Sequence, residues 1–216
     1  MTVELWCATG VFLAPIGGDI VVLDVNADQY HCLLDGAEWM VVGEGGSVTV
    51  PDEGAANELL AAGLAVGGRP KTPRRTPEPA RRQLATASTP SKRALLVSGF
   101  SLAAATISFR GKSLRQLVQT GLPASASTRH TPTDVRTLIE SVTAVQAALP
   151  WIPFEGECLQ RAFQVRCVLA RRGIHPDWVF GVRTWPFAAH CWLQIGDLVI
   201  ADTLDRVNRY TPIMVV

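Results

Sequence analysis

Three residues in the C-terminal half of this 216-residue chain could together carry out nucleophilic chemistry. Cys158 lies where a helix is predicted to begin, and a helix N-terminus favours an anion and therefore a thiolate. His190 and Asp202 lie on two successive predicted strands. A cysteine nucleophile needs a base that shares its proton and a third group that orients this base. We therefore predict that Cys158, His190 and Asp202 form a catalytic triad.

Each of these residues also has an ordinary structural interpretation. A single Cys near a helix start is often a small buried side chain. His190, beside Trp192, could be a satisfied core residue, and Asp202 could cap a turn. Their order along the chain, from helix Cys to strand His to next-strand Asp, favours the triad. Cys191 alternates to the strand face opposite His190, so it is not a candidate nucleophile.

The elements that must position the triad predict an α+β fold for the C-terminal half, with helices followed by antiparallel strands. Residues 94–109 carry no charge, but they are shorter and more polar than the roughly 18 apolar residues of a membrane span. A buried or amphipathic helix is therefore expected there. Further helices are predicted near residues 131–149 and 157–170, and strands at residues 178–182, 190–195 and 198–202.

The register of the last two strands decides whether His190 can meet Asp202. A two-residue turn would pair Ile195 with Leu198 and place Asp202 opposite Cys191. A three-residue connection would pair residue 194 with residue 198 and place His190 directly across from Asp202. We predict the three-residue connection, because the triad requires it.

The N-terminal part differs from the rest in charge. Residues 1–68 hold ten acidic residues and no Lys or Arg, which argues against nucleic-acid binding. Residues 69–93 are rich in Pro and Arg and are expected to form an extended linker. Five cysteines without paired spacing, and no apolar leader after Met1, indicate a reducing cytoplasm. The expected domains are residues 1–68, the linker 69–93, and residues 94–216.

Short β-rich runs at residues 11–13, 20–25 and 29–34 predict a three-stranded antiparallel meander. Helical patterns follow at residues 37–42 and 52–62, the second with Asp52 as a start signal and Gly63 as a stop. A small sheet with short helices would be a winged-helix-like domain.

Neither a metal nor a cofactor is expected. The chain has no C-x-x-C motif, and its four His are scattered. Residues 110–113 end like a phosphate-binding loop, but Thr106 occupies the position of the required first Gly, so ATP binding is not expected.

The ordered segments around the three residues resemble the transglutaminase-like leader peptidases of lasso-peptide biosynthesis. The resemblance is carried by residues 158–163, 169–174, 180–182 and 189–193, and by Asp202. It implies a papain-like triad of Cys158, His190 and Asp202. Cys191 departs from the pattern, which more often has a small residue such as Ala between His and Trp. Because Cys191 is predicted to face away, little consequence is expected.

Residues 21–25, 29–30 and 33–36 resemble the precursor-recognition element of the same machinery, a winged-helix relative of small peptide chaperones. A leader peptide could add as a strand to an exposed sheet edge. The residues expected to bind it form the third strand of the meander: Gln29, Tyr30, His31, Cys32, Leu33 and Leu34.

The resemblance implies a cysteine peptidase that binds the leader of a ribosomally made precursor and cuts it from the core peptide. Its implied partners are this precursor and a separate cyclase similar to asparagine synthetases. Two alternatives stay open. The same triad could transfer an acyl group to an amine, or the protein could be a non-catalytic adaptor with Cys158 buried.

Overall fold

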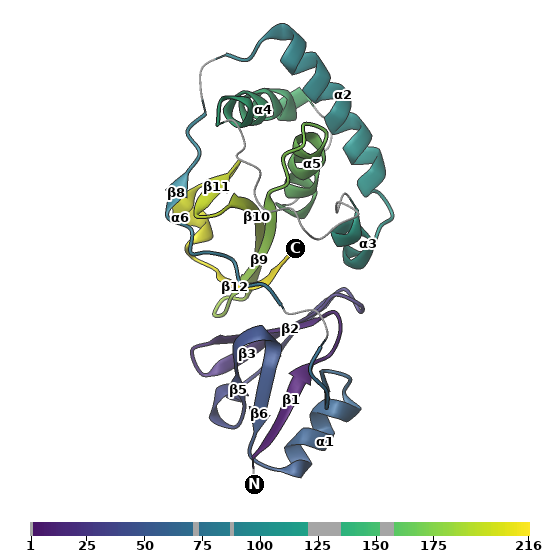
Figure 1. Ribbon diagram of the computed structural model, residues 1–216, viewed down its shortest axis with the longest axis vertical. Coiled ribbons are helices and arrows are strands. Elements are labelled where there is room, and N and C mark those ends of the chain that lie inside the picture. The colour runs from purple at the N-terminus through teal and green to yellow at the C-terminus, as the bar shows by residue number, and fades with distance from the viewer. Residues whose placement is uncertain (1, 71–73, 87–88, 121–134, 152–157) are drawn as a thin grey trace. The chain divides into compact units, whose positions relative to one another are not determined.

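The computed structural model describes residues 2–70, 74–86, 89–120, 135–151 and 158–216 (Figure 1). The chain divides into two compact units. The first comprises Met1–Thr76, Gly181–Ala189 and Thr211–Val215, and the second Pro77–Phe180, His190–Tyr210 and Val216. Each unit is described by itself below.

The N-terminal part of the first unit contains two antiparallel sheets. One has the strand order β5-β6-β1-β7 and the other the order β2-β3-β4. The strands are β1 (Val3–Cys7), β2 (Val11–Ile16), β3 (Asp19–Asp24), β4 (Gln29–Leu33), β5 (Val41–Val42), β6 (Ser47–Val50) and β7 (Ala65–Val66). The predicted meander is confirmed as β2-β3-β4. The central strand β3 is buried along nearly its whole length, as its unbroken apolar run predicts.

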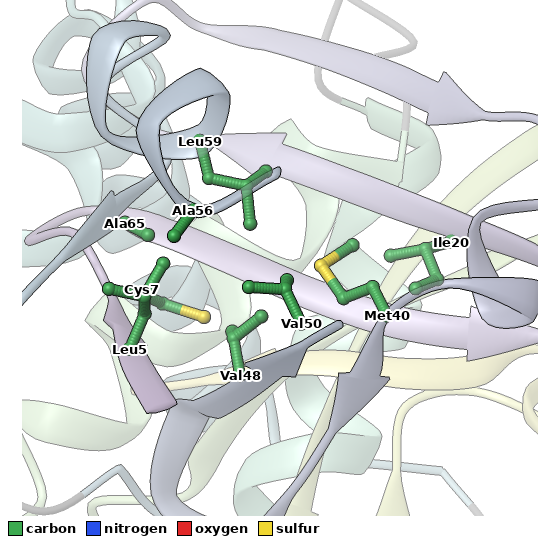
Figure 2. Close-up of a cluster of buried hydrophobic side chains, with 9 residues drawn as sticks. All are labelled: Leu5, Cys7, Ile20, Met40, Val48, Val50, Ala56, Leu59 and Ala65. Atoms are coloured by element: carbon green, nitrogen blue, oxygen red, sulfur yellow. The ribbon is translucent and has the colours of Figure 1, made fainter. Parts of the chain in front are cut away.

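Alternation along β1 and β6 builds the core of this part. Leu5 and Cys7 point inward from β1, and Val48 and Val50 point inward from β6, whereas their neighbours are more exposed. Helix α1 (Glu53–Ala61) adds Leu59 and Ala56 to the same cluster (Figure 2). As predicted, Asp52 caps this helix, and its side chain accepts a hydrogen bond from the backbone N–H of Ala55.

The predicted helix at residues 37–42 is wrong. A short 3-10 helix (Gly36–Glu38) is followed by the strand β5, in which Val41 pairs with Thr49. Asp35 has a left-handed backbone, and Gly36 lies against Ile20 so closely that a Cβ would sit 3.3 Å from Ile20 Cβ. This tight turn and the pairing with β6 override the local helical pattern. Within the described part of the first unit α1 is the only α-helix, so the winged-helix-like arrangement is not confirmed.

The second unit contains the helices predicted near residues 94–109, 131–149 and 157–170, and two short helices, the second and the last of the series below, that were not predicted. They are α2 (Lys92–Phe109), α3 (Leu114–Gln119), α4 (Val135–Ala148), α5 (Cys158–Ala170) and α6 (Leu204–Val207). Helices α2, α4 and α5 contact one another pairwise and form a helical layer (Figure 1). The predicted start of α4 at Thr131 lies outside the described residues. Across the described residues, no helix combines the length and apolarity that crossing a membrane requires.

The strands of the C-terminal half form one sheet together with a short strand from the predicted linker, in the order β12-β9-β10-β11-β8. They are β8 (Arg82–Gln83), β9 (Asp177–Arg183), β10 (Ala188–Ile195), β11 (Leu198–Ile200) and β12 (Thr211–Val215). Helices followed by antiparallel strands confirm the predicted α+β order. Strand β8 comes from the predicted linker and pairs in parallel with β11, so this stretch is part of a folded sheet.

A buried glutamine joins β10 to the segment before β8. Gln194 is 2% exposed, and its amide nitrogen donates to the backbone oxygens of Glu78 (2.6 Å) and Gly196 (2.5 Å). Its amide oxygen accepts from the indole N–H of Trp192 at 3.0 Å. Both ends of the amide are therefore used, which is the condition under which a buried polar side chain is stabilising.

We predict that Gln194→Ala lowers the free energy of unfolding by about 1–3 kcal/mol, because it leaves the buried indole N–H and two backbone oxygens without this partner. The matched control is Gln119→Ala at the exposed end of α3, which should change stability by less than about 0.5 kcal/mol. Urea unfolding followed by tryptophan fluorescence measures both. Equal midpoints for the two variants would contradict the role given to Gln194.

Candidate active site

Cys158 is the first residue of α5, and the helix is fixed by aromatic packing one turn further on. Phe163 is fully buried and lies between Phe109 of α2 (ring centroids 5.7 Å apart) and Trp178 of β9 (6.1 Å). Gln164 donates to the hydroxyl of Thr106 at 2.7 Å, which ties α5 to α2 a second time. The half-buried thiol of Cys158 therefore stands on a rigid element.

The second unit has a cavity of about 340 Å³ at this end of α5. Cys158, His190 and Asp202 all line it, so the structure brings the three predicted residues to one place. Cys191, Arg206 and Tyr210 line it as well. The imidazole of His190 is 8% exposed and is flanked by the rings of Trp192 and Tyr210, with centroids 6.2 and 5.2 Å away.

His190 and Asp202 are joined by a short hydrogen bond. Nε2 of His190 lies 2.6 Å from Oδ2 of Asp202, whose side chain is 12% exposed. The other oxygen, Oδ1, accepts from the backbone N–H of Thr203 at 2.7 Å and lies 3.7 Å from Nη1 of Arg206. An ionised carboxylate can only accept, so Nε2 carries the proton of the His190 bond and Nδ1 is left to face Cys158.

The predicted strand register is wrong, although the two residues meet. Ile195 pairs with Leu198 across the two-residue turn, the arrangement that would turn Asp202 away from His190. Strand β11, however, ends at Ile200, and Ala201 adopts a left-handed backbone with φ 58°. This break in the alternation redirects Asp202 toward His190.

The pKa of Cys158 is lowered to about 4. The largest cause is a hydrogen bond from the thiol of Cys191, which stabilises the thiolate. Burial acts in the opposite direction, and a hydrogen bond with His190, the backbone N–H of Cys191 and the charge of His190 lower the pKa further. Cys158 is therefore a thiolate at neutral pH, the form that acts as a nucleophile.

Burial would lower the pKa of His190, but the hydrogen bonds with Asp202 and then Cys158, and both of their charges, outweigh it and raise this pKa to about 9. Burial likewise acts to raise the pKa of Asp202, but the hydrogen bond from His190 and the contacts with Thr203 and Arg206 lower it overall. Between pH about 4 and about 9 the site thus holds a thiolate, an imidazolium and a carboxylate.

The prediction that Cys191 faces away without consequence is also wrong. Cys191 lines the same cavity as Cys158, and its thiol is the largest influence that lowers the pKa of Cys158. The pKa of Cys191 is raised well above its ordinary value, first by a hydrogen bond with Cys158, then by burial and by the charge of Cys158. Cys191 therefore keeps its proton and acts as a donor to the thiolate.

Sequence reasoning also missed Arg206 and Tyr210. Arg206 follows Asp202 by four residues, a spacing at which side chains of a helical turn meet, and this signal could have identified it. No comparable signal pointed to Tyr210, whose ring reaches His190 because the chain turns back after α6.

The six residues expected to bind a leader lie in the first unit. Gln29 to Leu33 form β4, which ends the β2-β3-β4 sheet as far as the structure describes it, and Leu34 follows at 61% exposure. A cavity of about 170 Å³ is lined by Tyr30, His31, Cys32 and Leu34 together with Thr184, Trp185 and Phe187. The cavity thus places residues of β4 beside the exposed aromatic side chains of Trp185 and Phe187.

A profile described as the transglutaminase-like superfamily matches residues 101–215, more than half of the chain. The chain belongs to the transglutaminase-like superfamily. The matched segment of this transglutaminase-like protein contains Cys158, His190 and Asp202.

The transglutaminase-like protein is also similar to a curated relative. It is 39% identical over 60 residues to the microcin J25-processing protein McjB of Escherichia coli. The match covers 28% of this chain and 29% of McjB, so it spans less than a third of the relative's length. No solved structure matches the chain.

We predict that iodoacetamide alkylates Cys158 well below pH 7. The thiolate is present above pH about 4 and is lost as the pH falls through that value. The pKa values of Cys7, Cys32, Cys167 and Cys191 are all raised, so these thiols should react slowly at pH 5. Peptide mapping after timed alkylation identifies the labelled residue.

In Asp202→Asn the imidazolium loses its carboxylate, so the pKa of His190 falls, that of Cys158 rises, and alkylation at pH 5 slows by roughly tenfold. The matched control is Asp205→Asn, whose side chain is 81% exposed, and it should leave the rate unchanged. An equal rate in wild type and Asp202→Asn would contradict this account of the thiolate.

Proposed function

We propose that this protein is a cysteine peptidase that cuts the leader from a ribosomally made lasso-peptide precursor. The observation that carries the proposal is the low-pKa thiol of Cys158 beside the His190–Asp202 pair in one cavity. Membership of the transglutaminase-like superfamily and the partial similarity to a microcin-processing protein support it.

In the proposed reaction the Cys158 thiolate attacks the scissile carbonyl carbon. The imidazolium of His190 then gives its proton to the departing amine, and the acyl group stays on the sulfur. Neutral His190 next activates a water molecule, which releases the acyl group as a carboxylic acid and restores the thiolate. Asp202 holds the proton-bearing Nε2, so that Nδ1 faces the reacting atoms throughout.

The developing oxyanion needs hydrogen-bond donors at a fixed place. We assign one of them to the backbone N–H of Cys158, because the first N–H groups of a helix have no partner within the helix. The helix dipole of α5 adds favourable potential for both the thiolate and the oxyanion.

The leader is proposed to bind along β4. Main-chain groups at a sheet edge can pair with an added strand, and the neighbouring apolar cavity can hold a side chain of the peptide. Residues 1–68 carry ten acidic residues and no Lys or Arg, so a basic leader would be favoured electrostatically. Binding here would raise the effective concentration of the scissile bond at Cys158.

Cleavage would free the N-terminus of the core peptide, the amine that a separate ATP-using cyclase needs for ring closure. The precursor and such a cyclase are therefore the proposed partners. Acyl transfer to an amine is the second candidate, because membership of the transglutaminase-like superfamily is compatible with it. Product mass separates the two: hydrolysis gives two peptides, whereas transfer gives a new amide.

Replacing the nucleophile tests the peptidase. Cys158→Ala and His190→Ala should each lower cleavage of a purified precursor by about a thousandfold or more, because each removes a participant in bond breaking. Both should bind a labelled leader as wild type does. The control is Cys167→Ala, another half-buried cysteine of α5, which should retain activity. Cleavage by Cys158→Ala, read by mass spectrometry, would end the assignment.

A surface substitution tests leader binding. Leu34→Ser should weaken leader affinity by roughly tenfold, since it removes an exposed apolar contact of the order of 1–2 kcal/mol. Leu60→Ser, on the 40% exposed Leu60 of α1, is the matched control and should leave affinity unchanged. Fluorescence anisotropy of a labelled leader measures both. Equal affinities for the two variants would place the leader elsewhere.

A further inference from the structure

The candidate site holds two thiols where nucleophilic catalysis needs one. Cys158 comes from the start of α5 and Cys191 from β10, thirty-three positions later in the chain. Both line the 340 Å³ cavity, and the Cys191 thiol is the largest influence that lowers the pKa of Cys158. No step of the proposed hydrolysis consumes the thiol of Cys191.

We propose that Cys158 and Cys191 are a disulfide-forming pair that takes hydroperoxides as its oxidant. The pair is a modification site: the nucleophile is stored as a disulfide and is recovered by a thiol reductant. This inference goes beyond the proposed peptidase, because it requires the two sulfurs and His190 but no peptide.

The first step is the reaction of a thiolate with a peroxide. The sulfur of Cys158 attacks one peroxide oxygen, the O–O bond breaks, and His190 gives its proton to the departing alkoxide or hydroxide. Cys158 is oxidised to a sulfenic acid, and the peroxide is reduced to an alcohol or water. Both thiols line the cavity of about 340 Å³, which has room for a small hydroperoxide such as hydrogen peroxide.

In the second step Cys191 becomes the nucleophile, because oxidation of Cys158 removes the thiolate that raises the pKa of Cys191. The largest effects that raise the pKa of Cys191 include its hydrogen bond to the Cys158 thiolate and the charge of that thiolate. A sulfenic acid is neutral, so both effects disappear. Cys191 then attacks the sulfur of Cys158, the S–O bond breaks, and the thiol proton passes through neutral His190 to the leaving hydroxide. The products are the disulfide and one water molecule.

The other cysteines of the described residues do not share this arrangement. Burial raises the pKa of Cys7 and Cys167, and neither lines the cavity. Cys32 belongs to β4 of the first unit. The shared cavity, and the mutual influence of a thiolate and a protonated thiol, single out Cys158 and Cys191. Cys191 is the residue that can intercept the sulfenic acid before further oxidation.

The test uses the purified full chain and one equivalent of hydrogen peroxide. After blocking of free thiols, peptide mapping should recover a linked pair of peptides containing Cys158 and Cys191, and dithiothreitol should separate them. Alkylation of Cys158 at pH 5 should be lost on oxidation and fully restored by the reductant. Recovery of Cys158 as a free thiol or as a link to any other cysteine would overturn the proposal.

A variant supplies a second readout. In Cys191→Ala, peroxide should carry Cys158 to sulfinic or sulfonic acid, and dithiothreitol should then restore less than about a tenth of the alkylation that the same variant shows before oxidation. Cys167→Ser should behave as wild type. Full restoration in Cys191→Ala would overturn the protective role. Neither readout uses a precursor peptide. The disulfide proposal can therefore be refuted without refuting the proposed peptidase, and the peptidase can be refuted without refuting the disulfide.

Discussion

The positive charge of His190 in the candidate site depends on one hydrogen bond, between its Nε2 and the carboxylate of Asp202. His190 is almost completely buried, and burial alone would favour a neutral imidazole. The carboxylate reverses this preference, and the resulting imidazolium lowers the pKa of Cys158 in turn. Asp202 can stay ionised because Thr203 and Arg206 supply further stabilisation. The nucleophile therefore depends in part on Asp202, which acts on Cys158 through His190.

The second thiol fits the same electrostatic logic. Ionising both of two neighbouring thiols costs additional free energy, because the second negative charge would lie beside the first in a partly buried site. Cys158 has the imidazolium and the helix start, whereas Cys191 is buried in a strand, so the proton remains on Cys191. Cys191 is thereby a donor that strengthens the thiolate. A small residue such as Ala at this position would offer only its backbone N–H.

Much of the fold could be predicted because it follows from local patterns. Helix α5 and strands β9 and β10 show the apolar periodicity of buried elements, and Asp52 marks the start of α1. The segment at residues 37–42 could not be predicted in the same way. Its conformation depends on Gly36 lying against Ile20 and on pairing with β6, which are contacts with residues outside the segment itself. The chemistry-bearing residue types were visible, but the influence of Cys191 on Cys158 was not, because it depends on how the start of α5 lies relative to the middle of β10.

His190 and Asp202 come together as predicted, although the predicted strand register is wrong. The predicted register places both residues on ideal strands, and on ideal strands the two side chains can meet only across the longer turn. The chain instead uses the shorter turn, with Gly196 at positive φ, and breaks the second strand at Ala201. The left-handed backbone conformation costs an alanine about 1–2 kcal/mol of free energy. An alanine in the sequence therefore gives no reason to predict it. The carboxylate's bonds to His190 and Thr203 can offset such a cost, so the strained backbone persists where the site needs it.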